Sequence, residues 1–170
     1  MSCIPYPTSN RRHFFGMSVV LALAANASCL AQDDIRIALQ AEAGTSGFEP
    51  GVALEWRPDG LHDTIVRPEA FISEDGRPGA GGAVLYDLST QFGVPARQAV
   101  AIGPRAVFHN SDDSGWEVDA MATWAYQLDG SDRGWRQSLG LIGALGVLHD
   151  RKHDENDVGA TAGAFFSFRF

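Results

Sequence analysis

Residues 158–170 read VGATAGAFFSFRF. From Val158 to Phe170 the even-numbered positions hold valine, alanine and phenylalanine, whereas the odd-numbered positions hold mostly glycine, threonine, serine and arginine. A period of two is typical of a β-strand, because successive side chains point to opposite faces of a sheet. The stretch therefore predicts a strand with one continuous apolar face.

The same period recurs upstream, and helical spacing is nearly absent. Alternation covers residues 35–43, 48–57, 66–73, 83–89, 97–109, 116–129, 135–147 and 158–170. Segments rich in Gly, Pro, Asn and Asp separate these stretches, as expected of turns. An even number of strands closes a barrel with both chain ends on one side. We therefore expect an all-β fold, an eight-stranded antiparallel up-and-down β-barrel, with irregular pairing at Pro50, Pro68 and Pro104.

Composition narrows the classes of protein further. The 170 residues include 13 Lys and Arg against 21 Asp and Glu, with a formal net charge of -8. This acidic balance argues against binding to nucleic acid, which requires a basic surface. No run of about 18 apolar residues occurs beyond residue 31, so membrane-spanning helices are not predicted. A mean hydropathy of -0.10 still suits a membrane protein built from alternating strands.

The first 31 residues have the layout of an export signal. Arg11, Arg12 and His13 precede an apolar run over residues 14–25, and small residues follow up to Ala31. A basic start, a short apolar core and an A-x-A-like site predict a secretory signal peptide. The paired arginines leave the twin-arginine export route open beside the general one.

We therefore expect a cleaved signal peptide over residues 1–31 and an outer-membrane-type barrel over residues 32–170, with cleavage after Ala27 as the alternative. Both cysteines, Cys3 and Cys29, fall within the signal. The barrel then has no thiol for a disulfide or for a metal site.

Alternation alone does not say which face points inward, because a soluble lipocalin-like barrel buries its apolar face and a membrane barrel turns that face to lipid. Small residues on the polar face suit the narrow interior of an eight-stranded barrel. Large aromatics on the apolar face fall near strand ends, as in the interfacial girdles of membrane barrels. The predicted lipid-interface aromatics are Trp56, Tyr86, Trp116, Trp124, Tyr126, Trp135, Phe168 and Phe170. A transmembrane barrel is expected, and a soluble periplasmic binding barrel is an alternative.

The polar faces of the strands predict a charge network in the lumen, with seven arginines and eight carboxylates. A single buried ion is very costly whereas a paired one is tolerated, so this near-balance predicts an interlocked plug. A proton or small-ion path along the same groups is the alternative. The predicted network comprises Arg36, Glu42, Glu55, Arg57, Arg67, Glu69, Asp87, Arg97, Arg105, Glu117, Asp119, Arg136 and Arg169, together with Glu49 and Asp129.

The end of the chain resembles that of a known family. Residues 166–170, FSFRF, are similar to the C-terminal strand of bacterial outer-membrane proteins, which end in Phe and are read by the barrel-assembly machinery. With the signal and the eight strands, the chain resembles a small barrel of the OmpA/OmpX type. The resemblance implies an outer-membrane location, contact with lipid and lipopolysaccharide, and recognition of Phe170 by the assembly machinery. From the lipid-facing alternation and the lack of a coherent catalytic set in the sequence, we expect a non-enzymatic, structural or surface-interacting role through acidic outer loops, with no cofactor.

A second hypothesis starts from residues 109–111, His-Asn-Ser, since a histidine base near a serine nucleophile is hydrolase chemistry. Outer-membrane lipid A deacylases are eight-stranded barrels with a His-x-Ser pair. The N-terminal half of this chain resembles them in part, at residues 55–58, 67–68 and 81–87. Their pair lies just before the last strand, where residues 149–151 read His-Asp-Arg and lack the serine. His109, Ser111 and His149 are the candidates for such an enzyme, and a strand end entering a loop is the plainer interpretation.

His149 and His153 lie four residues apart in an acidic segment. On a helix such a pair could bind zinc, but this segment is predicted to be a loop. We expect a solvated loop and no metal site, with weak divalent-cation binding near lipopolysaccharide phosphates as the alternative.

Overall fold

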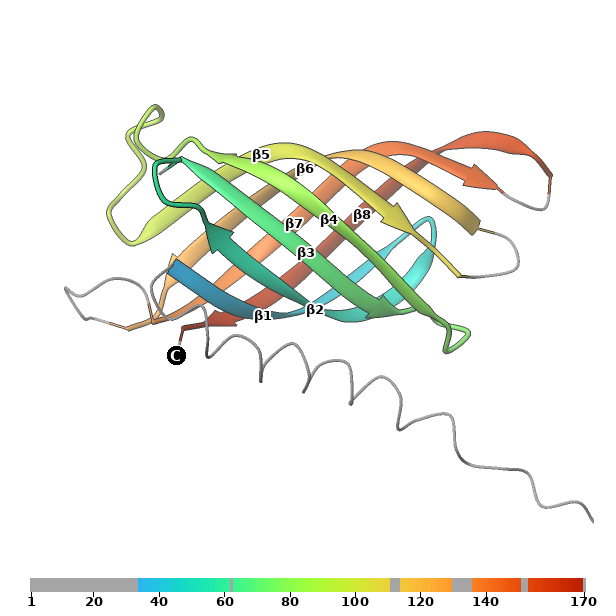
Figure 1. Ribbon diagram of the computed structural model, residues 1–170, viewed down its shortest axis with the longest axis horizontal. Helices are drawn as coiled ribbons and strands as arrows, with labels where there is room; N and C mark the ends of the chain where they lie inside the picture. Colours follow the sequence, from blue (N-terminus) through green and yellow to red (C-terminus); the bar gives the residue numbers. More distant parts are fainter. Residues whose placement is uncertain (1–33, 62, 111–113, 130–135, 151–152, 170) are drawn as a thin grey trace, which may run out of the picture.

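The computed structural model describes residues 34–61, 63–110, 114–129, 136–150 and 153–169, where eight β-strands form (Figure 1). They are β1 (Asp34–Gly44), β2 (Gly47–Arg57), β3 (Thr64–Ile72), β4 (Pro78–Asp87), β5 (Gln98–Phe108), β6 (Ser114–Gln127), β7 (Gln137–Asp150) and β8 (Glu155–Phe168). The predicted all-β, eight-stranded barrel is confirmed. The predicted signal peptide over residues 1–31 lies outside the described residues. Within the described ranges, no helix is long and apolar enough to cross a membrane.

Some strands begin earlier than their alternation indicates. β4 starts at Pro78, ahead of the first alternating position at Ala83, and pairs with β3 along its whole length. Glycines at positions 79, 81 and 82 carry no hydropathy signal, so a pattern of apolar and polar residues could not show this part of the strand.

Three prolines lie inside strands, and the ladder is interrupted beside each of them. The β2–β3 pairing begins only after Pro50 and lapses opposite Pro68. The β4–β5 pairing lapses opposite Pro104. Proline has no N–H to donate, so a strand that contains it keeps its full ladder on one side at most.

The barrel is closed, because β1 pairs with β8 and every other strand pairs with its neighbours along the chain. The paired residues can be followed from strand to strand around the closed sheet, starting at Asp34 of β1. One full turn returns to β1 at Gly44, so the strands are staggered by ten residues around the barrel. With a rise of about 3.3 Å per residue and a strand spacing of about 4.8 Å, this stagger tilts the strands by about 40°. Each residue therefore advances by about 2.5 Å along the barrel axis.

The two ends of the barrel carry different connections (Figure 1). We call distal the end with the β1–β2, β3–β4, β5–β6 and β7–β8 connections. The proximal end has the β2–β3, β4–β5 and β6–β7 connections, together with the start of β1 and the end of β8.

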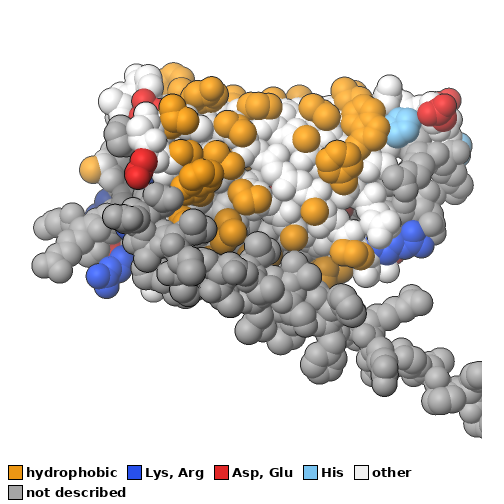
Figure 2. Space-filling model, in the orientation of Figure 1, with side chains coloured by type: hydrophobic (Ala, Val, Ile, Leu, Met, Phe, Trp, Pro, Cys, Tyr) orange, Lys and Arg blue, Asp and Glu red, His pale blue; other side chains and the backbone are white. Residues whose placement is uncertain are grey.

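The outward face of the wall is uncharged. Where side chains are described, no outward position of the eight strands holds Asp, Glu, Lys or Arg. Leu39, Val118, Leu141 and Leu145 are each at least half exposed there. On the face shown in Figure 2, hydrophobic side chains spread along the wall, and charged side chains gather near the two ends. The apolar face of the strands therefore points outward and the charged face inward.

The middle of the interior is packed with apolar side chains. The cluster comprises Ala38, Ala53, Ala83, Leu85, Ala101, Met121, Ile142, Ala144 and Phe165. Gly140 makes room for the Phe165 ring, since a Cβ at Gly140 would lie 2.3 Å from it. The guanidinium carbon of Arg67 lies 5.1 Å from the centre of the same ring. Side chains fill an eight-stranded interior in this way, and the cluster lies between the distal and the proximal half of the lumen.

Candidate functional site in the barrel lumen

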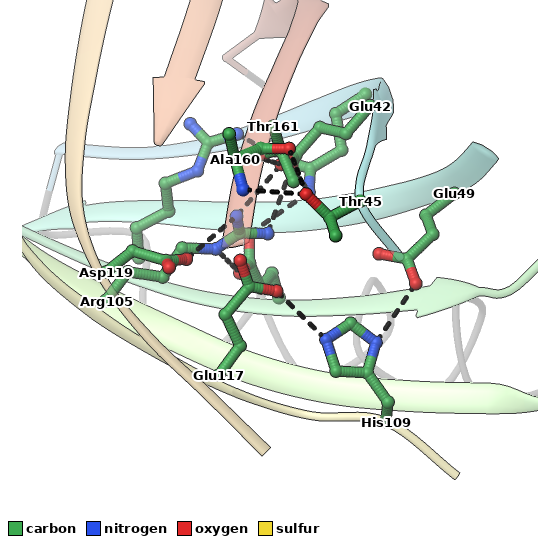
Figure 3. Close-up of polar contacts among 12 residues, drawn as sticks. Glu42, Thr45, Glu49, Arg105, His109, Glu117, Asp119, Ala160 and Thr161 are labelled. Carbon is green, nitrogen blue, oxygen red and sulfur yellow. Dashed lines mark hydrogen bonds and ion pairs between the residues drawn. The ribbon is translucent and has the colours of Figure 1, made fainter. Parts of the chain in front are cut away.

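Arg105 on β5 is the centre of a charged cluster in the distal half of the lumen (Figure 3). Its Nη1 lies 2.9 Å from Glu42 Oε2 on β1, and its Nε lies 2.5 Å from Glu69 Oε1 on β3. Its Nη2 also donates to Glu42 Oε1 at 3.2 Å. One guanidinium thus joins strands that are not neighbours in the wall. All three side chains are buried, so water screens these charge-assisted contacts little.

A second guanidinium, that of Arg67 on β3, is fully buried next to this cluster. It donates to Glu55 Oε1 at 2.8 Å and to the side-chain oxygen of Gln40. The Gln40 amide nitrogen in turn donates to Glu42 at 3.0 Å and to Glu69 at 3.1 Å. Gln40 therefore connects the two arginine centres into one network.

His109, directly after β5, bridges two carboxylates across the distal mouth (Figure 3). Its Nδ1 lies 3.0 Å from Glu49 Oε1 on β2, and its Nε2 lies 3.2 Å from Glu117 Oε2 on β6. An ionised carboxylate only accepts hydrogen bonds, so both ring nitrogens donate at once only when the imidazole is doubly protonated. The geometry therefore suits an imidazolium held between two acids.

A separate ion pair lies in the proximal half. Arg57 Nη2 is 2.7 Å from Asp87 Oδ2, and both side chains are half-buried. Asp87 Oδ1 also accepts from the backbone N–H of Ser89 at 3.0 Å and contacts its hydroxyl. This pair holds the end of β4 against β2, on the other side of the apolar cluster.

The predicted lumen network is brought together in part. Glu42, Glu55, Arg67, Glu69, Arg105, Glu117 and Asp119 lie in the distal cluster, and Arg57 and Asp87 form the proximal pair. Arg97, Arg136 and Arg169 are exposed at the proximal end, and Arg36 and Asp129 are half-buried. These arginines stand at or beyond strand ends, where long side chains reach water. The predicted near-balance of charge therefore does not extend to the buried part of the lumen.

Three members of the network were not predicted as such. The sequence pattern marks His109 as the end of a strand. It puts Gln40 and Thr161 on the polar face but indicates no role for them. Thr161 donates to Glu42 Oε2 at 3.3 Å. His109 shares its odd-numbered parity with Arg105, so the alternation already put both side chains on one face of β5.

The two described hydrolase candidates, His109 and His149, lie on opposite sides of the barrel wall. His109 points into the lumen with both ring nitrogens against carboxylates, whereas His149 lies on the outer side of β7 and stacks on Trp116 at 5.2 Å. His149 Nδ1 contacts Asn156 Oδ1 at 3.1 Å. Ser111 lies outside the described residues.

Metal ligands are also not gathered. Among the described residues, no group of three or more His, Cys, Asp or Glu side chains is placed to hold a metal ion. His153 and Asp154 are exposed in the β7–β8 connection, where His149 Nε2 lies 3.8 Å from Asp154 Oδ1.

The predicted interface aromatics fall into two groups by height on the wall. Trp56, Tyr86, Trp124, Tyr126 and Phe168 lie toward the proximal end, and Trp116 lies toward the distal end. Trp124 Nε1 donates to Gln98 Oε1 at 3.0 Å, which satisfies its polar group. Trp135 and Phe170 lie outside the described residues.

Together the fold and the lumen define a closed eight-stranded antiparallel β-barrel with an uncharged outer wall and a filled, charged interior. Comparison of the chain with protein-family models, with curated proteins and with solved structures gives no match.

Proposed function

We propose that the chain is a small non-enzymatic outer-membrane β-barrel, with lipid against its wall and a plugged lumen. The observation that carries this proposal is the absence of charge at the described outward positions of all eight strands. Hydrocarbon tolerates apolar side chains and penalises charged ones, whereas a water-facing wall has no reason to exclude charge. A soluble barrel for an apolar ligand has the opposite arrangement, with its apolar face around a cavity.

The dimensions of the wall support the same proposal. Trp116 and Tyr126 lie ten positions apart on the outward face of β6, which corresponds to about 25 Å along the barrel axis. The apolar band of outer-membrane barrels is about 25 Å tall and is flanked by aromatic residues. The spacing of these two rings therefore fits two membrane interfaces.

The lumen supports a structural or surface-interacting role rather than a pore. The apolar cluster and the distal charge network occupy the interior, so the proposed barrel offers no wide aqueous path. In the proposed orientation the distal connections face the cell exterior. Asp154 of the β7–β8 connection and Glu155 and Asp157 at the start of β8 are exposed there and form an acidic surface for lipopolysaccharide or an external partner.

Cell fractionation and a heat-modifiability gel test the proposal. The full chain, expressed in a Gram-negative bacterium, should sediment with the outer membrane and migrate differently before and after boiling, because a closed barrel stays folded in cold detergent. Recovery in the periplasmic wash without detergent, with no mobility shift, would overturn it.

The proposal includes recognition of residues 166–170 by the barrel-assembly machinery. Phe170→Ala should lower the folded fraction in the outer membrane, whereas Phe92→Ala, at an exposed phenylalanine in the β4–β5 connection, should not. Equal folded fractions for the two variants, measured by the same gel, would remove this part of the proposal.

A further inference from the structure

The buried part of the distal lumen holds more acids than cations. Five carboxyl side chains there are at least nine-tenths buried: Glu42, Glu49, Glu69, Glu117 and Asp119. Among the described residues, the buried cations facing them are Arg67 and Arg105, with His109 as a third when it is doubly protonated. Uncompensated buried charge costs several kcal/mol per ion. Two further positive charges are therefore needed for balance.

Asp119 is the carboxyl group that lacks a donor. Its residue is 4% exposed, and neither of its side-chain oxygens has a hydrogen-bond partner. The nearest cation, Arg105 Nη1, lies 3.7 Å from Asp119 Oδ2, which is too far for a hydrogen bond. By contrast, Glu42 and Glu69 accept from Arg105 and Gln40.

The strands packed around Asp119 offer it no other cation. On β7 it faces Gly146, and a Cβ there would lie 2.6 Å from Asp119 Oδ1, so only a glycine leaves room for the carboxyl group. The titratable and charged groups that face this region are Glu117 on β6, Arg105 and His109 at β5, Glu42 on β1, Glu49 on β2, and Arg67 and Glu69 on β3. The described inner positions of β7 around it are uncharged, and the nearest charged inner position of β8 is Asp157, an exposed acid opposite Leu148.

We propose that the distal lumen is a proton-binding site, in which Asp119 and Glu117 together hold at least one proton while the barrel is folded near neutral pH. The two side chains lie two positions apart on the inner face of β6. A protonated carboxyl group donates as well as accepts, so one proton both removes a buried charge and supplies the missing donor. No three metal ligands converge among the described residues, which favours a proton over a multivalent ion.

His109 connects this site with the distal surface. His109 is one of the residues that line a hollow of about 370 Å³ at the distal end, together with Phe108 and Asn110. A proton that arrives on His109 from water passes from Nε2 to Glu117 Oε2 over the 3.2 Å contact, and then to Asp119 on the same strand. The apolar cluster lies on the proximal side of the site, so in this proposal the site exchanges protons with the distal mouth. This inference rests on the lumen geometry alone and holds whichever membrane surrounds the wall.

Infrared spectroscopy of the folded barrel in detergent tests the proposal. A protonated carboxyl group gives a C=O band distinct from the carboxylate bands, and the wild type should show it near neutral pH. Asp119→Asn or Glu117→Gln should abolish or weaken the band, whereas Asp59→Asn, at an exposed carboxylate of the β2–β3 connection at the proximal end, should leave it unchanged. Absence of the band in the folded wild type would overturn the proposal, as would a band that neither lumen variant alters.

Unfolding as a function of pH is the second measurement. Unfolded carboxyl groups release their protons at about pH 4, so between about pH 5 and neutral the proposed site makes the folded state bind one proton more than the unfolded chain, and this site should raise the unfolding equilibrium constant about tenfold per pH unit. Above neutral the His109 imidazolium adds a rise of its own, because an unfolded histidine loses its proton at about pH 6.5. Asp119→Asn keeps the shape of the protonated side chain and should remove the rise below neutral, while Asp59→Asn, at an exposed carboxylate of the β2–β3 connection, should keep it. The wild-type unfolding free energy is also measured at different Na⁺ and K⁺ concentrations and constant ionic strength. If it changes with the metal-ion concentration and not with pH, a metal cation neutralises the site and the proposal is overturned.

Discussion

His109 Nδ1 and Glu49 Oε1 meet at 3.0 Å across the distal mouth, although their strands β5 and β2 are not neighbours in the wall. Removing the imidazole leaves Glu49 and Glu117 buried without their common donor. His109→Ala should therefore lower the free energy of unfolding in urea by about 2–5 kcal/mol, in the range for breaking a buried charged contact.

The pairing makes a double-mutant cycle the informative control. Glu49→Gln combined with His109→Ala should cost less than the sum of the two single variants, with a coupling energy of about 0.5–3 kcal/mol. Additive effects would show that the two side chains do not act on each other.

Arg105 provides the second prediction, because it is the only described cation within 3 Å of both Glu42 and Glu69. Arg105→Met keeps most of the side-chain volume but leaves two buried carboxylates without their cation, and should destabilise the barrel by about 3–5 kcal/mol. Arg97→Met removes an exposed arginine near the start of β5 and should change the unfolding free energy by less than about 0.5 kcal/mol. Equal stabilities of the two variants would contradict the paired role of Arg105.

Leu145 and Leu61 give a matched pair that tests the proposed contact of the wall with lipid, since their exposed fractions are 60% and 57%. Leu145 lies in the middle of β7, and Leu61 lies in the β2–β3 connection. Leu145→Arg should cost about 2–4 kcal/mol of stability in lipid vesicles, because the charge enters hydrocarbon. Leu61→Arg should be almost neutral. If both variants unfold at the same urea concentration, the wall of β7 does not face lipid.

Gly140 and Phe165 supply a prediction on packing. A methyl group at position 140 would lie 2.3 Å from the Phe165 ring and 2.5 Å from the Trp124 carbonyl oxygen. Gly140→Ala should therefore destabilise the barrel by about 1–3 kcal/mol. In the background of Phe165→Leu the ring is gone, so the same change should cost less, as measured by urea unfolding in detergent. If Gly140→Ala lowers the unfolding free energy by the same amount in that background, the strain comes from the contact with the Trp124 carbonyl oxygen and not from the Phe165 ring.

Alternation predicts the eight strands and the orientation of their faces well, because the period of two is a local property of each strand. It predicts strand ends poorly where glycines replace both apolar and polar residues, as at the start of β4. The inward position of Arg105, Glu117 and Asp119 follows directly from parity on β5 and β6.

The pairing of the lumen charges could not be predicted in the same way. Glu42, Glu69 and Arg105 meet because the stagger of the closed barrel brings positions on β1, β3 and β5 to one height. That stagger is the sum of the pairing registers of all eight strand pairs. The alternation within one strand says nothing about its register with the next strand. Arg97 and Arg169 have the inward parity, but the stagger places them at the proximal end, away from the buried acids of the distal cluster.

Thr45 and Ala160, 115 positions apart, exchange hydrogen bonds beside the β1–β8 ladder: the Ala160 N–H donates to Thr45 Oγ1 at 3.0 Å, and the Thr45 N–H donates to the Ala160 carbonyl at 3.0 Å. Every other strand pair joins neighbours in sequence and can form as a local hairpin. The β1–β8 pairing joins the two ends of the sheet, so we expect it to form last during folding. Until it forms, the growing sheet has two unpaired borders that can capture any extended peptide. In the proposed outer-membrane setting the chain would therefore need a chaperone between synthesis and insertion, and its aggregation should be governed by the lifetime of the open sheet.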